Sequence, residues 1–352
     1  DEGPALLELE GRVLAGKYRL GSLIGEGGMG QVYRATHLET GGLHAVKLLL
    51  PGSGDRAQAQ RRFQLEARNA AALLHPNTIR TTDFGQDGGL LYLVMEYVDG
   101  ESLEKVIERE GALPWRRAAQ IIAQVLKALW GAHDHERHII HRDIKPANIM
   151  LCESAGARDF VKVADFGISR ALEGTGADTQ GMIGTPQSMA PELWRGEPAD
   201  ARTDLYSLGC TAFHLLSGRR VFHGISGISL GYHHLQESPE PLEDQVSSET
   251  PAALIAWVER MMAKEPDDRY ASAAEALEAL EAVDADEREG PSLPPTSASE
   301  PVAGPPRRPW NRVFVVVGLA LLVGVGAGLA LQLNDGPEVL VEPAESSSRD
   351  SG

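Results

Sequence analysis

Four polar side chains in the middle of the chain are of the types that act on phosphate groups. Asp143 can serve as a base and Lys145 supplies a positive charge, while Asn148 and Asp165 offer oxygen atoms that suit a hard metal ion. Asp143 ends a His-Arg-Asp motif and Asp165 begins an Asp-Phe-Gly motif. Each motif alone would be read as a solvated turn, because three-residue motifs recur by chance. The two motifs in this order and at this separation favour phosphoryl transfer.

A glycine-rich segment precedes these residues, at 25–32, and three of its glycines follow the pattern GxGxxG. Glycine lets backbone amides approach phosphate oxygens closely, but the same spacing also opens the helix of dinucleotide-binding folds. The flanking residues decide between these folds. Residues 17–24 are typical of a strand, and residues 31–36 alternate again with a period of two. We therefore expect the glycines to join a hairpin.

One cation, Lys47, interrupts the apolar strand that we expect at 44–50. A buried strand rarely carries an unpaired lysine, because burial of an unpaired charge is costly. The helix expected at 57–74 places Glu66 at the edge of an apolar face, from which its carboxylate could reach Lys47. In the alternative, Glu66 is an exposed charge that pairs with an arginine of its own helix. We favour the ion pair with Lys47.

Further motifs follow Asp165. Residues 184–192 read Gly-Thr-Pro-Gln-Ser-Met-Ala-Pro-Glu, and a helix is expected at 205–216. Arg269 lies further on, in the motif Pro-Asp-Asp-Arg-Tyr.

Together, these segments resemble a bacterial Hanks-type serine/threonine protein kinase over residues 18–283. The resemblance implies an α+β fold with two lobes, in which a small, mainly antiparallel β lobe with one main helix precedes a larger, mainly helical lobe. It also implies an enzyme that transfers the γ-phosphate of ATP to Ser or Thr hydroxyls of protein substrates, with Mg²⁺, or alternatively Mn²⁺, as its metal ion. The family usually has an aromatic residue where Ser188 stands, so the chain departs from the pattern at this position.

The resemblance assigns a role to each site residue, and it implies a buried ion pair between Arg269 and Glu192. Asp143 is the base that orients the substrate hydroxyl, Lys145 contacts the γ-phosphate, and Asn148 and Asp165 bind the magnesium ions. The residues expected to bind ATP are Ile24, Gly25, Glu26, Gly27, Gly28, Met29, Gly30, Gln31, Val32, Ala45, Lys47, Glu66, Glu96 and Val98.

Two threonines, Thr175 and Thr179, lie between the Asp-Phe-Gly motif and residue 184. The resemblance implies that Thr179, and alternatively Thr175, is a regulatory autophosphorylation site whose phosphate pairs with Arg142. In the alternative interpretation, Thr179 is an ordinary polar residue of a loop.

Two other functions fit a chain of this general pattern. A kinase-like scaffold without activity would lack at least one of Lys47, Asp143, Asn148 and Asp165, and all four are present. A phosphotransferase that acts on small molecules would not need the segment at 184–192, because that element presents a peptide substrate.

Composition restricts the remaining choices. A net charge of −17 over 352 residues, without a basic stripe, argues against nucleic acid as a partner. The two cysteines, Cys152 and Cys210, provide no disulfide framework, which is consistent with a reducing compartment. The chain begins with Asp1 and not with Met, so whether sequence precedes it stays open.

A segment near the C-terminus is expected to cross a membrane, since residues 313–333 carry no charge and a span needs about 20 residues. A buried core helix is the alternative, but a segment rich in Pro and Ser separates these residues from the rest. The arginines at 307, 308 and 312 precede the span, so the positive-inside rule places the kinase domain in the cytoplasm and the C-terminal tail outside the cell membrane. Gly324 and Gly328 form a GxxxG pair that could support a homodimer.

The expected domain boundaries follow from these observations. They are an N-terminal extension at 1–16, a kinase domain at 17–285 with lobes at 17–97 and 98–285, a disordered linker rich in Pro and Ser at 286–311, a transmembrane helix at 312–333 and a short extracytoplasmic tail at 334–352.

Overall fold

The computed structural model describes residues 9–27, 30–49, 56–154, 156–166, 186–222 and 227–289. All of them belong to one compact unit, which comprises residues 1–292. The predicted transmembrane helix at 312–333 and the tail at 334–352 lie outside the described residues. Within the part of the chain that the structure describes, no helix is both long enough and apolar enough to cross a lipid bilayer.

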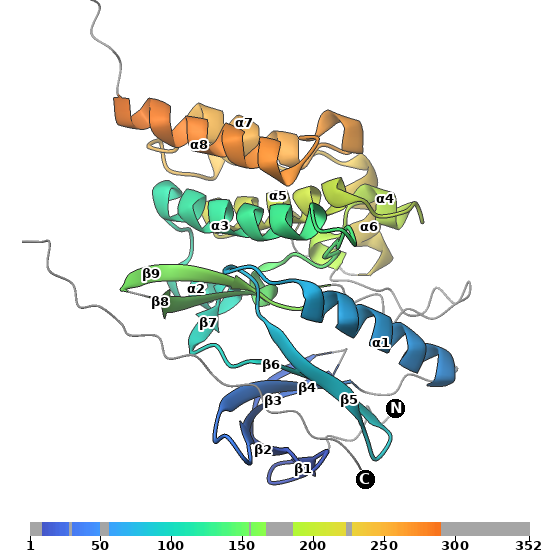
Figure 1. Ribbon diagram of the computed structural model, residues 1–352. Helices are drawn as coiled ribbons and strands as arrows, with labels where there is room; N and C mark the ends of the chain where they lie inside the picture. The colour runs from blue at the N-terminus through green and yellow to red at the C-terminus, as the bar shows by residue number, and fades with distance from the viewer. Residues whose placement is uncertain are drawn as a thin grey trace, which may run out of the picture. The chain divides into compact units, whose positions relative to one another are not determined.

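The N-terminal part of the unit, called the small lobe here, is a six-stranded antiparallel sheet with one long helix against it (Figure 1). The strands lie in the order β1-β2-β3-β4-β6-β5. Their bounds, with that of the helix, are β1 Val13–Leu14, β2 Tyr18–Gly27, β3 Gly30–His37, β4 Leu43–Leu49, α1 Arg56–Ala72, β5 Thr81–Asp87 and β6 Leu90–Glu96.

The two faces of this sheet bury different apolar clusters. Along β4, Val46 and Leu48 join the cluster on one face, whereas Ala45 and Leu49 join the cluster on the face that packs against α1. Successive side chains of a strand point to opposite faces, so Lys47 points toward the α1 face. The strand that the sequence predicts at 44–50 therefore also determines to which face of the sheet the Lys47 side chain points.

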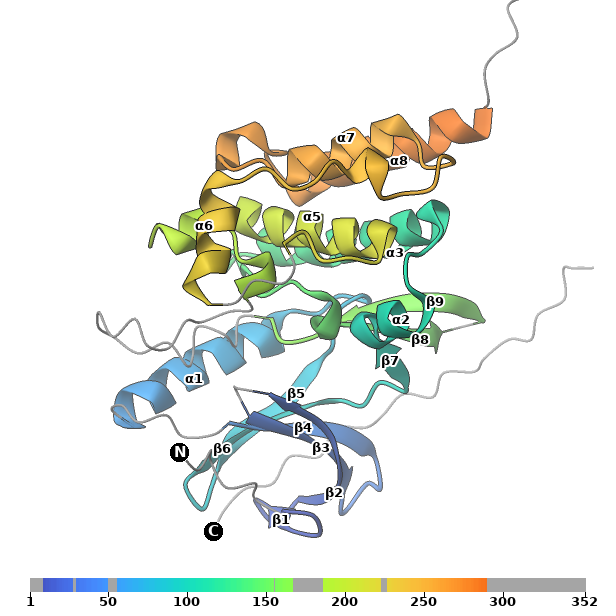
Figure 2. The same ribbon diagram turned by 180° about the vertical axis from the view of Figure 1, so that it is seen from behind.

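The rest of the unit, called the large lobe here, consists of a three-stranded sheet below two layers of helices. In Figures 1 and 2, α3 and α5 lie side by side in one layer, and α7 and α8 form the next. The bounds of its strands and helices are β7 Gly100–Ser102, α2 Leu103–Glu110, α3 Trp115–His133, β8 Ile149–Ser154, β9 Ala157–Val163, α4 Pro191–Trp194, α5 Ala201–Ser217, α6 Ile228–Gln236, α7 Ala252–Met261 and α8 Ala273–Glu289. Short 3-10 turns occur at η1 Pro146–Asn148, η3 Pro186–Ser188, η4 Leu242–Asp244 and η5 Pro266–Asp268.

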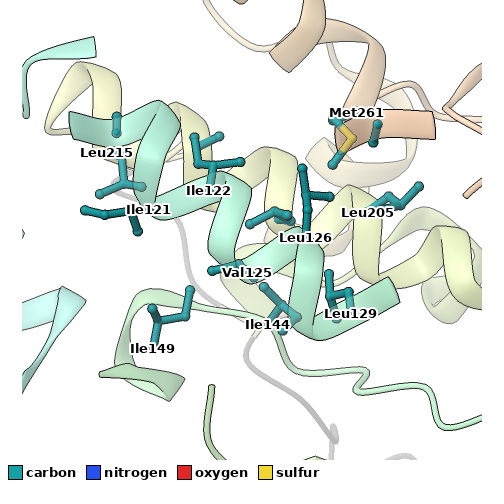
Figure 3. Packing of buried hydrophobic residues seen from close by; sticks show 14 of the residues in the cluster. Ile121, Ile122, Val125, Leu126, Leu129, Ile144, Ile149, Leu205, Leu215 and Met261 are labelled. Carbon is teal, nitrogen blue, oxygen red and sulfur yellow. The ribbon is translucent and has the colours of Figure 1, made fainter. Parts of the chain in front are cut away.

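Helix α3 is the centre of the apolar core of the large lobe (Figure 3). Its apolar residues recur at helical spacing and pack against α5 and α7 on one side and against Ile144 and Ile149 on the other. Each buried Leu or Ile contributes about 1.5–3 kcal/mol relative to an exposed one. Since Ile144 lies between Asp143 and Lys145, and Ile149 follows the loop with the candidate catalytic residues, this core anchors the loop at its middle and at its C-terminal end.

Most of the elements expected from the sequence are present, within a few residues of the expected ends. The fold differs in α8, which continues to Glu289, four residues into the segment at 286–311 that was expected to be a disordered linker. The added residues include Glu287, Arg288 and Glu289, and Glu and Arg have a high helix propensity. Strand β5 was not located by the sequence patterns, because its burial does not alternate cleanly.

Two of the connections between the lobes lie at strand β9. One is the chain itself, after β6, where Glu96 accepts a hydrogen bond from Lys162 of β9 at 2.7 Å. The other is the segment between α1 and β5, where Val163 N donates to Asn77 O and Ile79 N donates to Val163 O, both at 2.8 Å. The side chain of Asn77 also donates to Val161 O at 2.9 Å. A small-lobe segment is thus hydrogen-bonded directly to a strand of the large lobe.

Candidate active site

The loop at 141–148 brings three of the predicted site residues together. Lys145 Nζ lies 2.8 Å from Asp143 Oδ2. Asn148 Nδ2 donates to the backbone oxygen of Asp143 at 2.8 Å and to its Oδ2 at 3.1 Å. The Asp143 carboxylate is therefore held by a cation and an amide donor. Because its amide nitrogen is engaged, Asn148 keeps its carboxamide oxygen as the atom suited to a metal ion.

Asp204, in the first turn of α5, binds the backbone of this loop. Its carboxylate accepts the backbone N–H groups of His141 at 2.8 Å and of Arg142 at 2.7 Å, and it lies 2.8 Å from His133 Nε2. Burial acts to raise the pKa of Asp204, but the hydrogen bond with His133 and the nearby charges outweigh burial and lower it. The carboxylate therefore stays charged and fixes the backbone on the N-terminal side of Asp143.

Sequence reasoning did not assign Asp204 to the site. The available signal was an acidic residue in the first turn of a helix that is otherwise almost entirely buried. Asp200 already caps this helix, together with Thr203, so the charge at 204 was not needed as a cap.

His141 connects this loop to the Asp-Phe-Gly segment. Its Nδ1 accepts the backbone N–H of Asp143 at 3.2 Å, and its Nε2 lies 2.7 Å from the backbone oxygen of Ala164. The centroid of its ring also lies 4.6 Å from the centroid of the Phe166 ring, in an edge-to-face arrangement. The base and the second predicted metal ligand, Asp165, are thus linked through one imidazole.

Asp165 is the residue that holds Lys47 in this structure. Lys47 Nζ lies 2.7 Å from Asp165 Oδ2, and the lysine side chain is only 8% exposed. Burial acts to raise the pKa of Asp165, but the Lys47 charge and hydrogen bond outweigh burial and lower it. Asp165 has a φ of 63°, a left-handed conformation that costs energy for a residue with a side chain. Such strain at a functional residue is typical of active sites.

Glu66 lies on the buried face of α1, where its exposure is 7%. This burial disagrees with the alternative in which Glu66 is an exposed helix charge. Phe63, about one turn before Glu66, and Ala67, directly after it, belong to the cluster between α1 and the sheet. The predicted ion pair with Lys47 stays a prediction.

The glycine-rich segment forms the predicted hairpin between β2 and β3. Glu26 pairs with Gln31 and Gly27 pairs with Gly30, and the turn residues Gly28 and Met29 lie outside the described residues. Gly30 has a φ of 146°, and a Cβ atom there would lie 1.9 Å from Leu48 O. Glycine is therefore required at position 30 by its backbone conformation and by the close approach of β4.

The other residues predicted to bind ATP line the strands around this hairpin. Val32 and Ala45 pack in the cluster on the α1 face of the sheet, whereas Ile24 is 44% exposed. The side chain of Glu96 accepts hydrogen bonds from Lys162 at 2.7 Å and from Arg80 N at 3.1 Å. Since this carboxylate is engaged, a contact of Glu96 with a nucleotide would involve its backbone.

The buried pair expected between Arg269 and Glu192 is confirmed. The guanidinium donates to both carboxylate oxygens, at 2.9 and 2.8 Å, and the two side chains are 0% and 4% exposed. Thr203 Oγ1 also donates to Glu192 at 2.8 Å. This pair fixes the end of the segment at 184–192, from residue 186 onward.

Several predicted site residues lie outside the described residues. They are Gly28, Met29, Thr175 and Thr179, together with the glycine of the Asp-Phe-Gly motif. Arg142, the expected partner of a phosphate on the threonines, is described. It has a φ of 68°, and its buried Nε has no hydrogen-bond partner among the described residues.

The assembled groups suit chemistry on a phosphate. A carboxylate base, two lysines and two oxygen ligands lie on facing segments, and positive charge near transferring phosphates stabilises the charge that develops there. Within the described residues, no three His, Cys, Asp or Glu side chains gather to hold a metal ion. A metal at Asn148 and Asp165 would therefore take its other ligands from phosphate or water, as Mg²⁺ commonly does.

Comparisons with known proteins show which family the chain resembles. The family model of the protein kinase domain matches residues 18–280. The serine/threonine-protein kinase PknB of Mycolicibacterium smegmatis is 43% identical over 269 residues, which are 74% of this chain and 42% of that protein. PknB of Mycobacterium tuberculosis H37Rv is 41% identical over 269 residues, which are again 74% of this chain and 42% of that protein. The chain thus spans about two fifths of the length of the curated relatives that it matches.

Solved structures give the same result for the fold. The crystal structure of the M. tuberculosis PknI kinase domain superposes with a TM-score of 0.62 at 31% sequence identity, and the match covers 80% of this chain and 100% of that one.

Proposed function

The chain belongs to the protein kinase family, and from this premise we propose that it is a serine/threonine protein kinase that uses ATP and a divalent metal ion. The observation that carries the proposal is the arrangement of Asp143, Lys145 and Asn148 on one loop, joined through His141 to the segment of Asp165. The proposed reaction moves the γ-phosphate of ATP to a Ser or Thr hydroxyl of a protein substrate.

Each residue has a proposed role that follows from its chemistry. Asp143 accepts the proton of the substrate hydroxyl and orients it toward the phosphate, and Lys145 compensates the charge of the transferred group. Lys47 holds the nucleotide phosphates, with Glu66 as its proposed partner when nucleotide is bound. Asn148 and Asp165 would hold Mg²⁺, which neutralises phosphate charge when it is bound; Mn²⁺ is the alternative ion.

The proposed nucleotide site lies between the glycine-rich hairpin and β6. The backbone of Glu96 and Val98 would bind adenine, while Ala45 and Val32 would pack against it, and the amides of the hairpin would face the phosphates. Catalysis by such a site depends on positioning and electrostatics more than on covalent chemistry.

The test of this function is mapping of phosphorylated residues by mass spectrometry after the full chain has been incubated with ATP and Mg²⁺, alone and with a general Ser/Thr protein substrate. We expect phosphate on Ser and Thr only. Phosphate on small molecules without any on protein would favour the small-molecule phosphotransferase instead.

We further propose the organisation expected from the sequence, in which a kinase domain in the cytoplasm is attached to the cell membrane by one helix at 312–333. The support is the absence of charge over 313–333 and the arginines that precede it. A homodimer through Gly324 and Gly328 is part of this proposal.

Removal of residues 312–352 should move the protein from the membrane fraction to the soluble fraction and leave its kinase activity intact, because the proposed catalytic groups all lie before residue 166. Sedimentation of membranes followed by a phosphorylation assay on both fractions measures this. A matched control removes only residues 334–352 and should stay with the membrane. If the longer truncation still sediments with membranes, the anchor lies elsewhere.

Phosphorylation of Thr179 should activate the enzyme, because a phosphate adds about −1.5 to −2 charge and could pair with the Arg142 guanidinium, whose Nε is unpartnered within the described residues. We expect Thr179→Ala to lower the autophosphorylated enzyme's activity several-fold and Thr175→Ala to have less effect. Initial rates and phosphate mapping of both variants measure this. Full activity of Thr179→Ala, with no phosphate on either threonine, would remove the support for this switch.

A further inference from the structure

A cavity beside the catalytic loop has no role in the function proposed above. It measures about 50 Å³ and lies between Lys145, Ser188 and helix α5. The buried residues Cys210 and Thr211 contribute to its wall. The more exposed pair Arg220–Glu104, at 3.5 Å, also borders it. Since a water molecule needs about 10–15 Å³ of such space, the cavity has room for a small polar group.

The small side chain of Ser188 borders this cavity. Ser188 is one of its walls, and its hydroxyl donates to the backbone oxygen of Ile144 at 3.1 Å. An aromatic ring extending from this wall would need much of the available space. The small serine side chain therefore leaves open a space that an aromatic residue would fill.

Two polar groups that line the cavity lack hydrogen-bond partners. Gln187 Oε1 is buried and has no partner among the described residues. Within the same residues, the ring of His214 has no hydrogen bond either, although it lines the cavity. Burial, followed by the charge of Arg220, lowers the pKa of His214 to about 4. Near neutral pH the ring is therefore uncharged and can both donate and accept.

The charged groups at the cavity already have partners of opposite sign. Lys145 lies 2.8 Å from the Asp143 carboxylate, and Arg220 faces Glu104. A charged ligand would have to compete with these pairs, and burying it without a partner would be costly. An uncharged group that hydrogen-bonds with Gln187 and His214 meets neither obstacle.

We propose that this cavity is a specificity subsite, which receives a small uncharged polar side chain, such as that of Asn or Thr, from the protein substrate. The inference rests on the proposed function, because it places this side chain near the hydroxyl that is phosphorylated. Lys145 borders the cavity and also contacts Asp143. An extended peptide advances about 3.3 Å per residue, so the recognised residue lies within a few positions of the acceptor.

The experiment uses the full chain, ATP, Mg²⁺ and a set of serine peptides. Each peptide carries Asn, Ala, Asp or Lys at one of the three positions on either side of the acceptor, and kcat/KM is measured for each. At one position, we expect Asn to exceed Ala by about tenfold, the effect of a single well-placed hydrogen bond. The ratio of kcat/KM for the Asn peptide to kcat/KM for the Ala peptide is taken on one protein. A variant that is less active with every peptide therefore keeps this ratio.

Three variants remove the subsite in different ways. Gln187→Leu and His214→Leu each remove a hydrogen-bonding group, and Ser188→Tyr fills the space with a large side chain. In all three, we expect the ratio of Asn to Ala to fall to about one. The matched control is His135→Leu, whose ring accepts a hydrogen bond from Arg137 N and does not line the cavity. It should keep the ratio of the unaltered protein.

A ratio near one at every position in the unaltered protein would overturn the proposal, and so would a stronger preference for Asp or Lys, or an unchanged ratio in the three variants. Dissociation constants of the same peptides with Ala in place of the acceptor serine give a second readout that needs no phosphate transfer. If no peptide is phosphorylated, the proposed function fails, and these constants decide the subsite alone. If peptides are phosphorylated without selectivity, only the subsite fails.

Discussion

Asp165→Asn and Lys47→Met should each lower kcat/KM for phosphate transfer by about a thousandfold or more, while the protein stays folded. Asp165→Asn removes the carboxylate proposed to bind the metal ion, and Lys47→Met removes the cation proposed to hold the nucleotide phosphates. In the structure, these groups contact each other at 2.7 Å, so either change also breaks this pair. Steady-state phosphorylation of a protein substrate measures the effect, and circular dichroism checks the fold.

The matched control for Lys47→Met is Lys127→Met on α3. Lys127 is 46% exposed and pairs with Glu281 at 3.6 Å, away from the site. Loss of such an exposed ion pair costs roughly 0–1 kcal/mol of stability. The rate of phosphate transfer should therefore change less than about twofold. Near-normal rates in a folded Asp165→Asn protein would contradict the proposed metal ligand, whatever the behaviour of Lys47→Met.

Arg269→Met should destabilise the protein by about 3–5 kcal/mol, because it leaves the Glu192 carboxylate buried without its partner. Both side chains of the pair are almost fully buried, so water cannot replace the guanidinium. Urea unfolding measures the change. The double change Glu192→Leu with Arg269→Met should recover most of the loss, since replacing a whole buried pair by apolar residues is often nearly neutral.

The control for this prediction is Arg195→Met, which breaks a more exposed pair with Glu265 and should cost roughly 0–1 kcal/mol. The pH dependence gives a further check. Burial acts to raise the pKa of Glu192, but Arg269 outweighs burial and lowers it below the ordinary value of 4.5. The stability from this shift is complete above pH 4.5 and is lost as the pH falls through the lower folded pKa. Equal unfolding free energies for Arg269→Met and Arg195→Met would contradict the buried pair.

Local patterns in the sequence predict much of this fold. The alternation around Lys47 predicts strand β4, and the helical spacing from Ala118 to Leu129 predicts α3. Such patterns succeed because they record which face of an element is buried. The pair between Glu192 and Arg269 was instead implied by the resemblance to the kinase family, and it meets the need of a buried charge for a partner of opposite sign.

Contacts between distant segments are less accessible from the sequence. Lys47 contacts Asp165, 118 residues away, and the sequence argument did not name this contact. The support of the catalytic loop by Asp204 depends on how α5 packs under that loop, which no local pattern records. The cavity at Ser188 is likewise a property of packing. No local pattern in the sequence records it.

The double connection between the lobes restricts how the nucleotide site can open. These connections are the hydrogen bond from Lys162 to Glu96 and the hydrogen bonds of Asn77 and Ile79 with Val163, so both involve neighbouring residues of β9. The ion pair of Lys47 with Asp165, at 2.7 Å, also links the lobes, inside the proposed nucleotide site. Opening of the site by rotation about β9 therefore requires this ion pair to break.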